Sequence, residues 1–200
     1  AHGERFWVIG IHQSEEEMEW ESPIEFVATA VSGGSFEGFR SSDTESSEWG
    51  KFSFIPGSCA RGEIEIEGSV FNGGDTYRKV LYVSKLANVS GDYCSEQVSN
   101  GDTDSLTGSW YDPATSGQGF AIHKINETSG IVYFYGFDNN QSPLWLVGTW
   151  SQPLLPGEPI ELKMEQVSGG TFFRVNPEEV VREFWGTLLL ELQSCGKAYA

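Results

Sequence analysis

The chain has 200 residues, of which 38% are hydrophobic and 14% aromatic, so it can bury a core and does not have the composition of a disordered protein. Its formal net charge of −17 would repel a phosphate backbone, which argues against nucleic acid as a partner. No run approaches the roughly 18 apolar residues of a membrane span. We therefore expect an acidic, solvated protein with no membrane span.

Alternating and apolar runs predict strands along the chain. Residues 6–10 form an apolar run that predicts a buried strand, and residues 49–54 alternate large apolar with polar side chains, with Trp49, Phe52 and Phe54 as core candidates. Residues 63–67 alternate Glu with Ile so strictly that one face must be Ile and the other Glu. Further strands are expected at 78–85, 120–125, 131–137, 144–150, 160–167 and 187–192, with one short helix at 177–181.

The same motifs occur twice in the chain, at one constant spacing. The second set repeats the first in the same order: Gly33-Gly34, Trp49-Gly50 and Cys59 recur as Gly169-Gly170, Trp185-Gly186 and Cys195. This shared spacing predicts an internal repeat. We expect a first, N-terminally incomplete module at 1–94, a linker at 95–107 and a second, C-terminally incomplete module at 108–200.

The expected fold class is all-β. It comprises two related antiparallel β modules, each a sandwich or a partly open barrel, or both merged into one sheet system. Because each copy is incomplete, the modules should leave unpaired strand edges. These edges would be covered by the other half of the chain or by strand addition between chains.

The three cysteines predict a disulfide and no metal site. Cys59 and Cys94 flank the hairpin at 63–85, and closing that loop should stabilise the fold by about 4 kcal/mol. Cys195 is then left as a free or intermolecular thiol. There is no Cys-x-x-Cys spacing for zinc, and the acidic turns at 102–104 and 138–140 lack the EF-hand pattern. We expect no metal and no cofactor.

Catalytic motifs are absent from the sequence. The only histidines are His2, His12 and His123, and no nucleophile elbow, zinc-protease motif or P-loop occurs. We therefore expect that the chain is not an enzyme. A carbohydrate-active enzyme stays open as a third class, because sequence does not reveal whether two carboxylates are paired in a cleft.

Aromatic side chains indicate a ligand-binding function more strongly than any residue pattern indicates catalysis. The candidate ligand-binding residues are Trp110, Tyr111, Tyr133 and Tyr135, since exposed Trp and Tyr commonly stack on sugars and peptides. Trp110 and Tyr111 are adjacent in a strand, so they should face opposite sides of it. Trp145 and Trp185, flanked by apolar residues or Gly, are expected in the core.

The second module almost entirely, and the first from Phe6 to Cys94, resemble a family of secreted bacterial tandem-repeat proteins with no assigned activity. The resemblance is carried by G-x-W-Y-D-P-x-x-S-G-x-G-F at 108–120, P-x-W-L-x-G at 143–148, and the later G-G-x-F, W-G and C motifs. It implies a secreted or cell-surface location in bacteria. Where the family has a turn glycine this chain has Asn140-Gln141, and asparagine can adopt the left-handed conformation. The opening at 108–111 is also similar to that of avidin-like barrels.

These observations favour an extracellular, non-catalytic binding or adhesion module. Its partner would be a glycan or a protein ligand, recognised through exposed aromatics. The alternative is a structural subunit of a self-assembling filament or surface layer, whose partners are copies of the same chain joined by strand addition.

Overall fold

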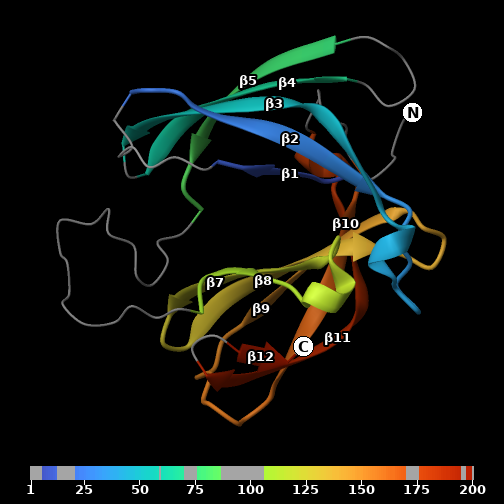
Figure 1. The fold of residues 1–200 in the computed structure, drawn as a ribbon. Helices are drawn as coiled ribbons and strands as arrows, with labels where there is room; N and C mark the ends of the chain where they lie inside the picture. The colour runs from blue at the N-terminus through green and yellow to red at the C-terminus, as the bar shows by residue number, and fades with distance from the viewer. Residues whose placement is uncertain are drawn as a thin grey trace.

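The computed structural model describes residues 6–12, 21–58, 60–69, 76–86, 106–169, 176–194 and 197–199. This part of the chain is all-β, as predicted, and forms two antiparallel sheets that are not closed into barrels. Figure 1 shows the two sheets one above the other. Three short 3₁₀ turns accompany them: η1 (Ser41–Asp43), η2 (Pro113–Thr115) and η3 (Pro177–Glu179).

Sheet one contains five strands in chain order: β1 (Val8–Ile11), β2 (Ile24–Ser32), β3 (Glu45–Ser58), β4 (Arg61–Ser69) and β5 (Thr76–Ser84). The alternating Glu and Ile residues of β4 point to opposite faces, as predicted. Ile66 packs against the buried residues Ala28, Ala30 and Trp49, while Glu65 accepts a hydrogen bond from Arg78 on the neighbouring strand. The isoleucines and the glutamates of β4 therefore lie on opposite faces of the sheet.

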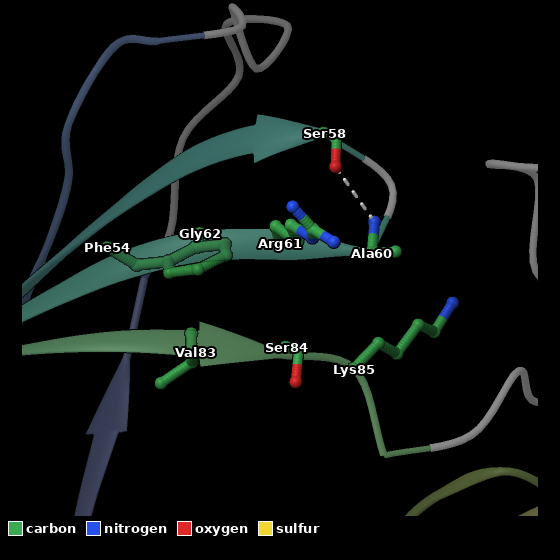
Figure 2. Close-up of a pocket in the computed structure, with 8 residues that line it drawn as sticks. All are labelled: Phe54, Ser58, Ala60, Arg61, Gly62, Val83, Ser84 and Lys85. Carbon is green, nitrogen blue, oxygen red and sulfur yellow. Dashed lines mark hydrogen bonds between the residues drawn. The ribbon is translucent and has the colours of Figure 1, made fainter.

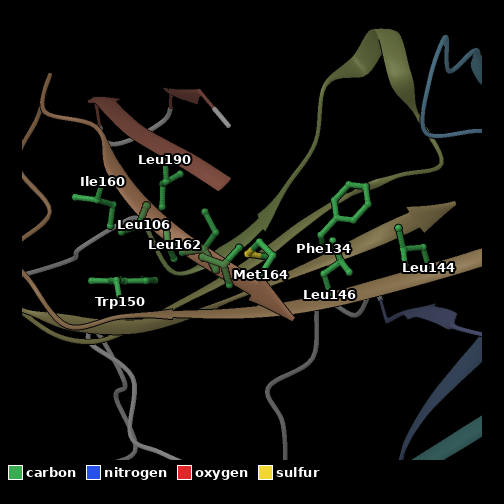
Figure 3. Close-up of a cluster of buried hydrophobic side chains, with 11 residues drawn as sticks. Leu106, Phe134, Leu144, Leu146, Trp150, Ile160, Leu162, Met164 and Leu190 are labelled. Carbon is green, nitrogen blue, oxygen red and sulfur yellow. The ribbon is translucent and has the colours of Figure 1, made fainter. Parts of the chain in front are cut away.

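Sheet two contains β6 (Gly108–Trp110), β7 (Gly119–Asn126), β8 (Ser129–Phe137), β9 (Pro143–Trp150), β10 (Ile160–Ser168) and β11 (Val181–Ser194), continued by the short β12 (Lys197–Tyr199). Its strands also follow chain order. The larger of the two cores lies on one face of this sheet (Figure 3), and its members include Val132, Leu144, Leu146, Trp150, Leu162 and Leu190.

Corresponding elements of the two sheets share the spacing of the repeated motifs. β2, η1 and β3 begin at Ile24, Ser41 and Glu45, and β10, η3 and β11 begin at Ile160, Pro177 and Val181, with the same offset for all three pairs. The register shifts in strand pairing occur at positions that differ by the same offset. One follows Ala28 in β2 and another follows Met164 in β10, so the paired strands bend at the same position in both sheets.

The sheets contact each other through Trp7, which precedes β1, and through the segment between β2 and β3. The indole Nε1 of Trp7 donates to the Gly136 carbonyl oxygen at 3.1 Å, and the rings of Phe39 and Phe137 stack at 6.4 Å. The Glu37 backbone N–H donates to Asn139 Oδ1 at 3.0 Å. Both sheets thus share packing around Phe137, which is fully buried.

Sequence predictions about burial are wrong for residues 6–10 and Trp185, and the burial of Leu106 was not predicted. Residues 6–10 do not form a strand that is buried on both faces, because β1 is an edge strand with Ile9 and Ile11 exposed. Leu106, placed in the linker, is 2% exposed and belongs to the core of sheet two. Trp185, expected in the core, is 39% exposed.

Other predictions lie outside the described residues or remain untested. Cys59, Cys94 and Cys195 are outside the described ranges, as are most of the linker and the turn at 102–104. The module boundaries at 94 and 108 stay predictions. Among the helices of the described ranges, none has the length and apolar character that a membrane crossing requires.

Candidate ligand-binding face

The face of sheet two that points away from the core carries a line of aromatic rings. Along β8 the residues Val132 and Phe134 enter the core, so Tyr133 and Tyr135 lie on the opposite face, where both are half-buried. Their ring centroids are 6.3 Å apart and their planes differ by only 21°. The strand period of two thus produces a stacked tyrosine pair directly from the sequence.

Tyr135 is the centre of a row that crosses the sheet. Its register partners are Gly119 on β7 and Trp145 on β9. A Cβ atom at Gly119 would lie 3.1 Å from the Cβ of Tyr111 and 2.6 Å from the Trp110 carbonyl oxygen. Tyr111 therefore lies beside Gly119 on the same face, and the close approach of the backbone requires glycine there.

Small residues separate the rings on β7. Gly119 stands between Tyr111 and Tyr135, and Ala121 is the register partner of Tyr133. Among the described residues of β7, none places a large side chain between Tyr111 on one side and the stacked tyrosines on the other. We call the set Tyr111, Tyr133, Tyr135, Trp145 and His123 the aromatic face.

Further aromatic contacts continue the line at both ends. The His123 ring meets Tyr133 edge-on at 5.8 Å. At the other end the Trp7 ring lies 6.2 Å from Tyr135 and 6.0 Å from Phe137. Because Trp7 precedes β1, the two sheets together position this end of the line.

Burial affects the chemistry of Tyr135. Burial raises the pKa of its phenol above the ordinary value, and the neighbouring Tyr133 raises the pKa further. The Tyr135 hydroxyl consequently keeps its proton throughout the neutral pH range. A neutral phenol can both donate and accept a hydrogen bond, and its ring offers an apolar face.

The structure brings three of the four predicted ligand residues onto one face. Tyr111, Tyr133 and Tyr135 lie together, and Tyr111 is 63% exposed. Trp110 faces the other way: its indole packs against the core, and its Nε1 donates to the Leu106 carbonyl oxygen at 2.8 Å. The prediction that the adjacent pair faces opposite sides agrees with this arrangement.

Sequence reasoning missed two aromatic residues of this region. Trp145 was expected in the core, but it lies on the aromatic face because Leu144 and Leu146 take the buried positions of β9. That alternation was readable from the sequence. Trp7 could not have been found in this way, because its place beside Tyr135 depends on the docking of the two sheets.

The acidic turn at 138–140 is stabilised by hydrogen bonds to its own aspartate. Asp138 Oδ1 accepts the backbone N–H groups of Asn140 at 2.8 Å and Ser142 at 3.0 Å. This pattern holds the turn between β8 and β9. Within the described ranges, no group of three or more His, Cys, Asp or Glu residues is arranged to hold a metal ion.

Comparison with known proteins gives no relative for this chain: no family model, no curated protein and no solved structure matches it.

Proposed function

We propose that this chain is an extracellular, non-catalytic binding module that recognises a glycan or a peptide through its aromatic face. The carrying observation is the stacked pair Tyr133 and Tyr135, aligned with Tyr111 across the gap at Gly119. Two nearly parallel rings held on a sheet lose little conformational freedom when a ligand contacts them. Sugars and peptide side chains are the usual ligands of such platforms.

An internal repeat forms part of the proposal. The equal spacing of β2, η1 and β3 from β10, η3 and β11, together with the matched irregularities, supports two copies of one structural unit. The aromatic face, however, is built from β7 to β9. Of these strands only β9 has a described counterpart in sheet one, since Leu144 to Gly148 and Phe6 to Gly10 share the W-aliphatic-aliphatic-G pattern. We therefore place the ligand on sheet two.

Removal of the tyrosine rings tests the proposal. A glycan array and a peptide library identify a ligand of the full chain, and titration then gives its Kd. Tyr135→Ala and Tyr111→Ala should each weaken binding about tenfold, because each loses one ring contact worth roughly 1 to 1.5 kcal/mol. Tyr111→Ala should leave the melting temperature nearly unchanged, since that side chain is exposed.

Tyr82→Ala is the matched control. Tyr82 is 86% exposed on β5 of sheet one, away from the aromatic face, so its removal should leave the Kd unchanged. Equal loss of affinity in Tyr82→Ala and Tyr135→Ala would place the ligand elsewhere and contradict the proposal.

A second candidate is self-assembly by strand addition. Its supporting observation is the nine-residue strand β5, which pairs only with β4 among the described strands and exposes Val80 and Tyr82. Long edge strands of this kind recruit further strands. If β5 joins chains into filaments, light scattering should give a mass that grows with protein concentration, whereas a constant monomeric mass would exclude this candidate.

A further inference from the structure

Strand β11 of sheet two has one edge that is open over most of its length. On one side β11 pairs with β10 along residues 181–190, and on the other side β12 pairs only with residues at 191–194. Among the described strands, none pairs with residues 181–190 on that second side. Phe184, Trp185 and Leu189 are exposed there. An open strand edge with exposed apolar side chains can accept a further strand.

Sheet one shows which strand covers the equivalent edge. Strand β3, the counterpart of β11, is covered by β4, and this pairing begins at Ser58 and Arg61 (Figure 2). At the spacing of the repeated motifs their counterparts are Ser194 and Lys197, which also pair with each other. β12 therefore lies where β4 begins. The edge that the rest of β4 covers in sheet one corresponds to residues 186–190, which β12 does not reach.

The equivalent glycines of the two strands differ in their surroundings. A Cβ atom at Gly50 would lie 2.1 Å from the carbonyl oxygen of Glu67 on β4. At Gly186, no described atom lies within 4 Å of such a Cβ atom. Glycine is required at position 50 because a neighbouring backbone comes so close. At position 186 the same residue leaves space for a backbone that the described strands do not supply.

The tryptophans that precede these glycines differ in the same way. Both lie at the register shift of their strand. Trp49 is 8% exposed, and its indole lies on Gly68 of β4, where a Cβ atom would come within 2.5 Å of the ring. Trp185 is 39% exposed, although the Phe36 ring meets it edge-on at 5.0 Å. A strand that placed a glycine beside Trp185 would cover it as β4 covers Trp49.

We infer that the edge of β11 at 186–190 binds an extended segment of a separate polypeptide, in the position that β4 takes on β3. Leu188 and Leu190 belong to the core side of sheet two, and β4 places isoleucine opposite their counterparts in sheet one. The segment therefore carries β-branched apolar residues at these two positions, which extend the core. Two residues further on, a glycine lies beside Trp185.

The other face of the segment differs from that of β4. In sheet one, Glu67 is the register partner of Lys51. The counterpart of Lys51 is Thr187, and an exposed Leu189 takes the place of Ser53. The net charge of −17 also opposes the approach of further carboxylates. An uncharged segment, with threonine opposite Thr187 and an aliphatic residue opposite Leu189, fits this edge.

The described strands of a second copy do not meet these requirements. β4 is paired on both of its edges, with β3 and β5. β5 is an edge strand of nine residues, but it contains no glycine. The other strands at sheet edges, β1, β6 and β12, have only four, three and three residues. The occupant is therefore a different polypeptide, and its site shares no residue with the aromatic face.

A nine-residue peptide tests the inference. Its sequence, Arg-Gly-Thr-Ile-Val-Ile-Thr-Gly-Ser, is that of β4 with uncharged residues in place of the three glutamates. Fluorescence anisotropy of the labelled peptide with the full chain gives the Kd. In amide chemical-shift mapping, the peptide should shift residues 185–190 and leave Tyr133 and Tyr135 unchanged.

Gly186→Ala should weaken peptide binding at least about tenfold, because its Cβ atom takes the space of the incoming carbonyl group. The melting temperature of this variant should stay the same or rise slightly, so a loss of binding does not reflect unfolding. Gly57→Ala is the matched control on sheet one. The nearest described atom to its Cβ is the Arg61 carbonyl oxygen at 3.7 Å, an ordinary contact, so this variant should keep the Kd.

A second peptide, with valine in place of the glycine before its terminal serine, tests the contact with Trp185. It should bind at least about tenfold more weakly, although valine favours strands, because its side chain would meet the indole. Equal Kd values for the two peptides, or for Gly186→Ala and the unchanged chain, would overturn the inference. So would a mass that grows with protein concentration and returns to the monomer in Gly186→Ala, since the occupant would then be a second copy. Tyr135→Ala should leave the peptide Kd unchanged, which separates this test from that of the aromatic face.

Discussion

Replacing Phe137 with alanine is expected to lower the free energy of unfolding by about 3 to 5 kcal/mol, the range of buried Phe→Ala changes. Phe137 is 0% exposed. Its ring contacts Trp7 and Phe39, both of which come from the sheet-one half of the chain. The substitution therefore removes packing from within sheet two and between the sheets. Urea unfolding followed by tryptophan fluorescence measures the loss.

Tyr82→Ala serves as the control for Phe137→Ala. Because Tyr82 is highly exposed, its removal should change the unfolding free energy by no more than about 0.5 kcal/mol. A loss below about 1 kcal/mol for Phe137→Ala would contradict the packing of the two sheets around this ring.

Gly50→Ala is the second substitution with a large expected effect. A Cβ atom at Gly50 would lie 2.1 Å from the Glu67 carbonyl oxygen and 2.6 Å from the Gly68 Cα. Both are backbone atoms of β4, which cannot move aside without disturbing its pairing with β3 and β5. We expect a loss of about 3 kcal/mol or more, the upper end of overpacking costs.

The repeated motif supplies a matched control in Gly186→Ala. Gly186 is the counterpart of Gly50 and also follows a tryptophan, and no described atom lies within 4 Å of a Cβ placed there. Alanine at 186 should therefore be neutral or stabilise by roughly 0.5 kcal/mol, because the unfolded chain loses freedom. Thermal unfolding of the two variants side by side checks the contrast. Similar melting temperatures would show that the approach of β4 to Gly50 is not as close as described.

Local pattern predicted the strands well. Alternation at 63–67 and the apolar run at 131–137 lie within β4 and β8, and the helical turn expected at 177–181 appears as η3. The cause of that turn is local too. The Asn176 side-chain oxygen accepts the Glu178 backbone N–H at 3.2 Å, as the Asp112 carboxylate accepts the Ala114 N–H at 2.8 Å before η2. Such caps involve only near neighbours.

Which strand residues are buried was less predictable, because their burial depends on residues that are distant in the sequence. Nothing near Ile9 or Ile11 in the sequence reveals that β1 lies at a sheet edge. Leu106 looks like part of a polar linker until its burial beneath sheet two is known. One local detail also differed: the turn at Asn140-Gln141 takes the left-handed conformation at Gln141, with φ of 65°, and not at Asn140. Candidate ligand residues could be named, but the shared face of Tyr111 and Tyr135 required the β7 register.

Strand order in both sheets follows chain order, and this has a consequence for how the protein folds. Every pairing within a sheet joins consecutive strands, so most of the structure can form as a series of hairpins with small loop-closure costs. The described contacts between the two sheets include Trp7 with Gly136, and Phe36 and Phe39 with Phe134 and Phe137. We expect each sheet to form early and the docking of Trp7 to come late. The end of the aromatic line beside Tyr135 would then be the last part of the proposed binding surface to be assembled.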